Sequence, residues 1–254
     1  MRMAYIKWNG TRRAALLERD SAILLDGMFG QWRKTDIILP LSEVEFCCIE
    51  RPSKVVAVGL NYRQHIEEMG EKVHDDPVLF LKPPTAVIGP GEAIVLPVQA
   101  GQVDYEAELA VVIKKEARYL SPQQVNDAIL GYTCLNDVTA RELQKKDGQW
   151  TRAKGFDTFC PIGPIVTDEI DPNHVQVKLV QNGKVRQNGN TSMFLYPVQE
   201  LISYISSVMT LLPGDVVTTG TPPGIGPMQA GDTVCVEIEG IGQLINPVKQ
   251  EIRR

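Results

Sequence analysis

Short apolar segments of β-strand character, separated by turns that contain glycine or proline, recur along the whole chain and limit what it can fold into. Only residues 197–214 have the length and periodicity of a long amphipathic helix, which is expected to begin at Pro197 and end at Pro213-Gly214. The other helical patterns are short and do not alternate regularly with the strands. The sequence therefore predicts a β-rich α+β fold rather than a doubly wound parallel sheet.

Two regions are expected within the 254 residues. Residues 1–53 have the pattern of a small β-rich N-terminal module, and residues 54–254 carry the remaining strands. In the second region, the Asn182-Gly183 pair predicts the turn of a hairpin. Shorter helices are expected within residues 61–69, 121–130 and 140–147.

The composition argues against several classes of protein. A net charge of -5 and an isoelectric point near 5.3 are unlike those of a nucleic-acid binder. The sequence has no apolar run near the ~20 residues that a membrane helix needs, and its N-terminus does not resemble a signal peptide. The five cysteines form no C-x-x-C pair and the three histidines are scattered, which disfavours a disulfide framework or a zinc site. We therefore expect a cytoplasmic protein with no nucleic-acid or membrane partner.

The segment "VDYEAELAVVI", residues 103–113, carries acids at every second position: Asp104, Glu106 and Glu108. On a regular strand these three side chains share one face. They could line a solvated edge, or they could bind a divalent cation, because Mg²⁺ and Ca²⁺ prefer oxygen ligands. Asp137 is a further candidate ligand, since it follows an apolar strand where an unpaired carboxylate would be costly.

A second group of polar residues suggests acid–base chemistry. His65 and Glu68 are three positions apart on an expected helix, so they share a face. The histidine could take a proton from water, or the pair could simply be a surface ion pair. Lys154 and Gln144 lie in neighbouring segments and could be either functional or solvated. The loop at residues 218–226 could bind a carboxylate through its backbone N–H groups, or it could be only a turn.

Six segments together resemble the fumarylacetoacetate hydrolase family, in that family's order: "VGLNYRQHIEEMG", "PVLFLKPPTAVIGPG", "DYEAELAVVI", "GYTCLNDVTARELQ", "AKGFDTFCPIGP" and "LLPGDVVTTGTPPGIGP". The resemblance covers roughly residues 54–250. It implies a mixed β-sandwich roll that assembles as a homodimer and binds Mg²⁺, with Mn²⁺ or Ca²⁺ as alternatives.

The resemblance also assigns roles to individual residues. It implies that Glu106, Glu108 and Asp137 hold the metal ion. His65 and Glu68 match the family's pair that activates water, on a segment that becomes ordered over the substrate.

The remaining matches concern the substrate. Lys154 and Gln144 match residues that contact the substrate or its developing negative charge, and Thr221 matches a threonine that binds the substrate carboxylate. Arg141 matches a family arginine without a fixed role. Some acylpyruvate-cleaving members have a basic residue where this chain has Leu60, so specificity for acylpyruvates stays open.

The activity implied by the resemblance is metal-dependent hydrolysis of a C–C bond in acylpyruvates or similar β-diketo acids through a metal-stabilised enolate. The same enolate serves isomerases, decarboxylases and tautomerases of 2-oxo or 2-hydroxydiene dioates, such as 2-hydroxyhepta-2,4-diene-1,7-dioate or oxaloacetate. An enzyme of aromatic-compound catabolism is expected in either case. A non-catalytic binder of a metal and a metabolite is a third interpretation.

Overall fold

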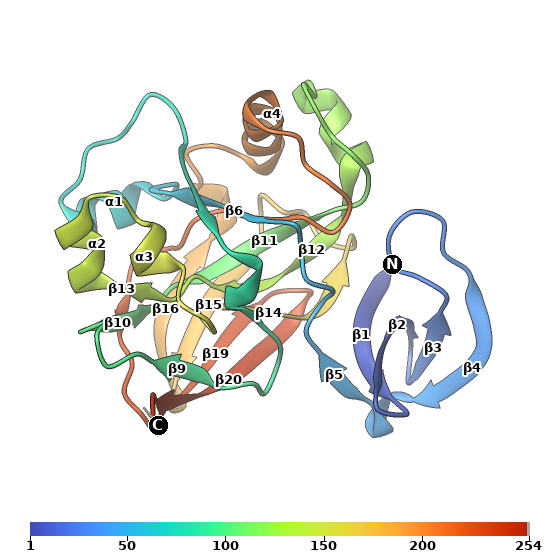
Figure 1. Ribbon diagram of the computed structural model, residues 1–254. Coiled ribbons are helices and arrows are strands. Elements are labelled where there is room, and N and C mark those ends of the chain that lie inside the picture. The colour runs from blue at the N-terminus through green and yellow to red at the C-terminus, as the bar shows by residue number, and fades with distance from the viewer. Residues whose placement is uncertain (253–254) are drawn as a thin grey trace.

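One mixed sheet of twelve strands extends through most of the computed structural model, which describes residues 1–252 (Figure 1). Its strands are β1 (Arg2–Trp8), β2 (Thr11–Glu18), β3 (Ser21–Leu25), β4 (Lys34–Pro40), β5 (Glu45–Cys47), β6 (Val55–Gly59), β7 (Val78–Lys82), β8 (Val87–Ile88), β11 (Ala107–Ile113), β12 (Ile129–Asn136), β14 (Cys160–Thr167) and β17 (Val216–Thr218). The main path runs β4-β3-β2-β1-β14-β12-β11-β17-β6-β7, while β5 pairs with β1 and β8 pairs with β14.

The N-terminal strands continue this sheet. Strand β1 pairs antiparallel with β14, with Met3 opposite Val166. It also pairs with β2 through a turn at Asn9 and Gly10, both of which have positive φ angles. An Asn-Gly turn suits this conformation, because both residues tolerate positive φ. The proposed boundary near residue 53 stays a prediction.

A second sheet packs against the first. Its order is β16-β15-β19-β20-β9, and a separate three-stranded sheet has the order β13-β10-β18. The strands of these two sheets are β9 (Ile94–Leu96), β10 (Val103–Tyr105), β13 (Thr139–Ala140), β15 (Gln176–Gln181), β16 (Lys184–Asn190), β18 (Gly226–Pro227), β19 (Thr233–Ile238) and β20 (Gly242–Gln250). Alternate residues of β15 and β19, such as Val177 and Val236, share one buried apolar cluster with Leu109 and Val111 of β11. The predicted β-rich, sandwich-like α+β fold is confirmed.

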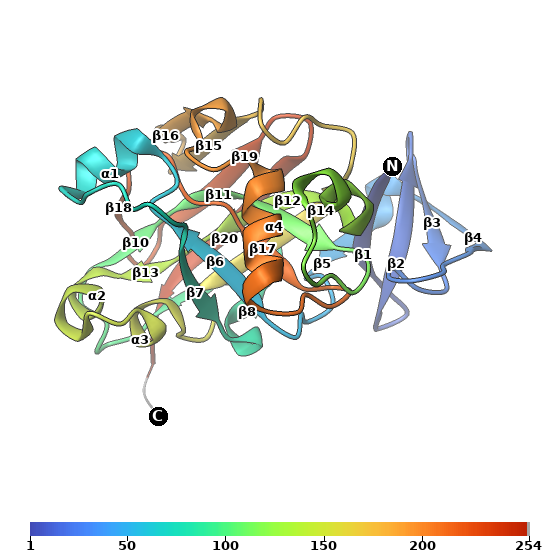
Figure 2. The ribbon, with the colours of Figure 1, turned by 90° about the horizontal axis from the view of Figure 1, so that it is seen from above.

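Helices lie around these sheets. They are α1 (Arg63–Met69), α2 (Arg141–Asp147), α3 (Thr151–Lys154) and α4 (Val198–Val208), with 3₁₀ turns η1 (Leu41–Glu43), η2 (Pro84–Ala86), η3 (Pro122–Ala128) and η4 (Thr191–Met193). Helix α4 lies across the large sheet, and α1, α2 and α3 gather at one end of it (Figure 2). None of the helices in residues 1–252 is both long and apolar enough to cross a membrane.

Two helices differ from their sequence patterns. Helix α4 ends at Val208 instead of Pro213, because the chain becomes extended at Met209 and Leu211 then forms a bridge with Ala117. The segment after Ser121 forms a 3₁₀ helix instead of an α-helix. The bridge of Leu211 with Ala117 is a long-range contact that the helical pattern does not contain.

Candidate active site

The acidic segment at residues 103–113 is not one regular strand, because it breaks at Glu106. Strand β10 belongs to the three-stranded sheet and β11 to the large sheet. At the break, the N–H of Glu106 donates to Oδ1 of Asn136 and the N–H of Ala107 donates to Oε1 of Gln187, both at 2.9 Å. Amide side chains thus replace the missing ladder partners, so that the backbone can change direction without leaving buried donors unpaired.

Three carboxylates converge beside this break. Glu106, Glu108 and Asp137 each present one oxygen, and these oxygens all lie within 4.8 Å of one another. Asp137 is held in place by its N–H, which donates to the carbonyl of Glu106 at 2.9 Å. All three residues are at most 4% exposed, so this is not a solvated edge.

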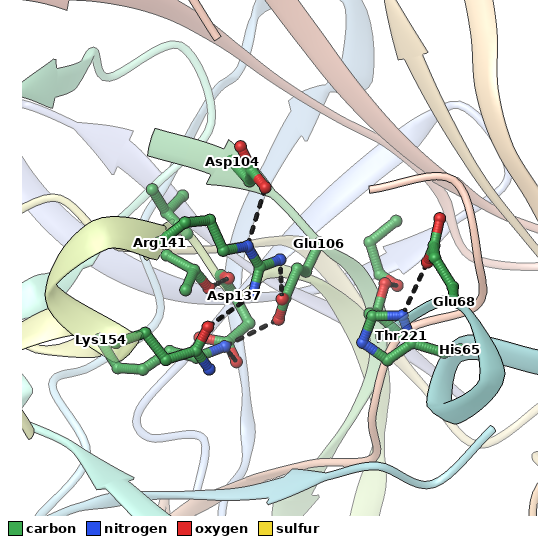
Figure 3. Close-up of polar contacts among 12 residues, drawn as sticks. His65, Glu68, Asp104, Glu106, Asp137, Arg141, Lys154 and Thr221 are labelled. Carbon is green, nitrogen blue, oxygen red and sulfur yellow. Dashed lines mark hydrogen bonds and ion pairs between the residues drawn. The ribbon is translucent and has the colours of Figure 1, made fainter. Parts of the chain in front are cut away.

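Two buried lysines partly neutralise the cluster. Lys154 Nζ donates to Glu106 Oε2 at 2.8 Å and to Asp137 Oδ2 at 2.6 Å (Figure 3). Lys82, at the end of β7, donates to the other oxygen of Asp137 at 2.5 Å. Lys82 is fully buried and was not among the predicted site residues. A lysine that ends an otherwise apolar strand was the available signal, since a buried ammonium needs a carboxylate partner.

The third cation is Arg141, the first residue of α2. Its Nε donates to Asp104 at 2.8 Å, its Nη2 donates to Glu106, and its Nη1 donates to Gln144 Oε1 at 2.9 Å. Asp104 is therefore a counter-ion of Arg141 and lies outside the set of three converging carboxylates. The alternating acids of the sequence have different roles because the strand is broken between them.

The cations leave Glu108 as the least neutralised carboxylate. Burial opposes ionisation of Glu106, but Lys154 and Arg141 outweigh it and hold the pKa of Glu106 well below its ordinary value. For Glu108, burial together with the charges of Asp137 and Glu106 raises the pKa well above its ordinary value. Its contacts are neutral donors, the hydroxyl of Thr218 and the N–H of a glycine. An oxygen-rich, under-neutralised group of this kind fits a divalent cation.

His65 and Glu68 form the second part of the site. His65 Nδ1 lies 2.9 Å from Glu68 Oε2. Because a carboxylate only accepts at neutral pH, Nδ1 carries the hydrogen and Nε2 is the basic nitrogen. The other oxygen of Glu68 accepts the N–H of Gly224 at 2.9 Å. Glu68 thus ties α1 to the loop after β17 and fixes the orientation of the imidazole ring.

A ring of hydrogen bonds holds Thr221. Gln187 Nε2 donates to Thr221 Oγ1 at 2.8 Å and to the carbonyl of Pro222 at 2.7 Å, while Thr221 Oγ1 donates to the carbonyl of Ala107 at 2.9 Å. The amide orientation of Gln187 is fixed, because its Oε1 accepts a backbone N–H. The hydroxyl of Thr221 has therefore already used its one proton. Gln187 had no recognisable signal in the sequence, since it lies in an otherwise polar strand.

These groups line a cavity of about 470 Å³. Eight of the nine predicted site residues line it: His65, Glu106, Glu108, Asp137, Arg141, Gln144, Lys154 and Thr221. Glu68 does not line the cavity and stands behind His65. The lining also includes the apolar side chains of Leu60, Phe80 and Trp150, and the Phe80 ring lies 5.0 Å from Lys154 Nζ. Leu60 has a φ of 59°, a left-handed conformation that is costly for a bulky side chain.

The fold and this cavity define a β-rich protein whose buried carboxylates could hold a divalent metal. A family model described as fumarylacetoacetate (FAA) hydrolase C-terminal matches residues 54–249, and the chain belongs to the fumarylacetoacetate hydrolase family. A second family model, described as Rv2993c-like N-terminal, matches residues 1–48.

Relatives with three different activities are similar to this chain. The 5-carboxymethyl-2-hydroxymuconate delta-isomerase from Mycobacterium smegmatis is 43% identical to this chain in sequence. Its crystal structure matches with a TM-score of 0.93, and the match covers 99% of this chain and 100% of that one. The mitochondrial oxaloacetate tautomerase FAHD2A of Bos taurus is 41% identical, and the match covers 83% of this chain and 71% of that protein. A fumarylacetoacetate hydrolase from Exiguobacterium antarcticum is 35% identical, with a TM-score of 0.87 over 99% and 100% of the two chains. Family membership therefore supports an enzymatic role.

Proposed function

We propose that this protein catalyses keto–enol proton transfer on small 2-oxo acids that carry a second carboxylate, as an isomerase or tautomerase. The observation that carries the proposal is the arrangement of the cavity. A cluster of buried carboxylates and cations forms one side, and an oriented histidine stands at the other (Figure 3). An acid–base group opposite an electrostatically prepared wall is what enolisation of a ketone requires.

Glu106, Glu108 and Asp137 are the residues that would hold a divalent ion. When bound, Mg²⁺ or a similar ion supplies Lewis-acid polarisation of the 2-oxo acid oxygens. The charges of the site agree with such an ion. Within residues 1–252, the four carboxylates Asp104, Glu106, Glu108 and Asp137 face three buried cations, Lys82, Arg141 and Lys154, which leaves one negative charge when all are ionised.

The chain's own residues would move the proton and hold the charge. His65 Nε2 removes a proton from the carbon next to the ketone and can return it to another carbon, while Glu68 keeps the ring in position. Lys154 uses two of its three hydrogens on Glu106 and Asp137, so one remains for an oxygen that gains negative charge.

Hydrolysis of a C–C bond in an acylpyruvate is the second candidate. The His65–Glu68 pair favours it, because the same basic nitrogen could remove a proton from water. We place it second because the isomerase and the tautomerase are 43% and 41% identical to this chain, whereas the hydrolase is 35% identical.

A cytoplasmic homodimer is part of the same proposal, and sedimentation analysis of the purified protein tests the dimer.

Product analysis tests the proposed function. The Mg²⁺-loaded protein is incubated in deuterated water with oxaloacetate, a 2-hydroxymuconate-type dioate and an acylpyruvate. Isomerisation or tautomerisation leaves the carbon skeleton intact and introduces deuterium. Hydrolysis releases two acids, and decarboxylation releases CO₂. No change in any substrate would contradict an enzymatic role and favour a metabolite binder.

His65→Asn tests the proposed base. Turnover is expected to fall by about 10²-fold or more, as general acid–base losses do, while Mn²⁺ affinity stays the same. His174→Asn is the matched control, because His174 pairs with Asp171 at 3.0 Å with the same three-residue separation but is exposed. Equal turnover in the two variants would remove His65 from the mechanism.

A further inference from the structure

We propose that Gln144 and Lys145, in the middle of α2, form a subsite for the distal carboxylate of a 2-oxo dioate. The inference rests on the proposed function and extends it, because it names the residues that would distinguish a dicarboxylic from a monocarboxylic substrate. Both residues line the cavity.

One face of α2 extends along the cavity wall. Arg141, Gln144, Lys145 and Gly148 all line the cavity, and their separations of three, four and seven positions place them on one side of the helix. Arg141 is tied to the buried carboxylate Glu106, whereas Lys145 is exposed. The helix therefore presents polar donors from the buried cluster out to the solvent side.

The amide of Gln144 has a free donor end. Its Oε1 accepts a hydrogen bond from Arg141 Nη1 at 2.9 Å, and a guanidinium can only donate. This contact fixes the orientation of the amide, so the NH₂ group is at the other end. Within residues 1–252, that NH₂ group makes no hydrogen bond. It is available to an acceptor on a ligand.

Lys145 lines the cavity but has no carboxylate partner among the described residues. The cavity is lined by the cations Arg141, Lys145 and Lys154. Arg141 and Lys154 are each bound to two carboxylates of the cluster. Lys145 forms no ion pair or hydrogen bond with any described residue. Glu71 also lines the cavity but does not form an ion pair with Lys145.

The charges explain why a second carboxylate would need this lysine. The cluster carries one negative charge, which becomes one positive charge when a divalent ion is present. The carboxylate of the 2-oxo acid group balances that charge. A second carboxylate would then have no remaining positive partner in the buried cluster, and Lys145 could supply it. The apolar residues of the cavity lining, Leu60, Phe80 and Trp150, suit the carbon chain between the two ends.

Binding of two five-carbon acids tests the subsite. Titration calorimetry on the full-length Mg²⁺-loaded protein compares 2-oxoglutarate with 2-oxopentanoate, which has a methyl group in place of the distal carboxylate. The wild type is expected to bind 2-oxoglutarate more tightly. Lys145→Met should weaken 2-oxoglutarate by about five- to tenfold, the scale of a charge-assisted contact that is partly exposed, and should leave 2-oxopentanoate within about twofold. Gln144→Glu should also weaken 2-oxoglutarate selectively.

Lys146→Met is the matched control, since Lys146 is the next residue of the same helix, is exposed and does not line the cavity. It should leave both affinities unchanged. A wild type without preference between the two acids overturns the subsite, and so does equal weakening of both acids by Lys145→Met. The binding measurement needs no turnover. A protein that shows the preference but converts no substrate would therefore overturn the proposed function and support the subsite.

Discussion

Replacing Gln187 by methionine should destabilise the protein and distort its carboxylate cluster. The side chain is fully buried and joins three groups from two other segments: the N–H of Ala107, the hydroxyl of Thr221 and the carbonyl of Pro222. Methionine has a similar volume but forms none of these hydrogen bonds. The change therefore tests hydrogen bonding with little change in packing.

The expected magnitude follows from what is left unpaired. Gln187→Met leaves the Ala107 N–H and the Pro222 carbonyl without partners, and both residues are buried. Each unsatisfied buried group costs about 1–3 kcal/mol, so the free energy of unfolding should fall by roughly 2–6 kcal/mol. This is a large part of the ~5–15 kcal/mol typical of a folded protein. Metal affinity should fall as well, since Ala107 lies between Glu106 and Glu108.

Guanidinium unfolding in the presence of EDTA measures the first effect without a contribution from bound metal. Manganese titration of the native protein measures the second. Gln243→Met is the control, because Gln243 is exposed and its side chain donates to the partly exposed carboxylate of Glu237. That variant should remain within about 0.5 kcal/mol of the wild type. If Gln187→Met also stays within this range, the hydrogen-bond ring does not support the break in the strand.

Two further predictions concern the metal and the loop. In the metal-free protein, burial beside two other carboxylates raises the pKa of Glu108, so this group keeps its proton to higher pH. Mn²⁺ affinity should therefore increase as pH rises through that pKa. Binding should also release a proton, which calorimetry in buffers of different ionisation enthalpy would detect. A pH-independent affinity without proton release would contradict this. Gly224→Ala should cost about 1–3 kcal/mol and lower turnover, because Gly224 has a φ of 100° and an added Cβ would lie 2.4 Å from the carbonyl of Arg186. Gly231→Ala is the control, because Gly231 has a φ of 95° but an added Cβ there would have no neighbour within 4 Å. It has the backbone strain without the clash that would displace the loop. Equal turnover in the two variants would exclude a role for the loop.

Local patterns predicted much of the fold. The Asn182-Gly183 pair does form the turn between β15 and β16, and both residues have positive φ angles. Gly70 ends α1 in a left-handed conformation, as a glycine after a short helix suggests. These features depend on a few adjacent residues, and for that reason the sequence is sufficient to predict them.

The site was predictable only in part. The resemblance led to residues that the structure does bring together, including Glu106, Glu108 and Asp137. The period-two pattern missed the break at Glu106, because the backbone donors there are satisfied by side chains far away in the sequence. Lys82 was missed for a similar reason, since its partner Asp137 is 55 positions away. Long-range polar contacts of this kind leave no periodic signal.

The pairing of β1 with β14 bears on how this chain tolerates truncation. The register joins Arg2, Met3 and Ala4 to the last three residues of β14, from Ile165 to Thr167. A shortened protein that began after β5 would leave the backbone donors and acceptors at this end of β14 unpaired, at an exposed edge of the sheet. Exposed sheet edges of this kind can pair with strands from other molecules. Because β1 pairs with this part of β14, we expect removal of the first strand to promote self-association through the large sheet.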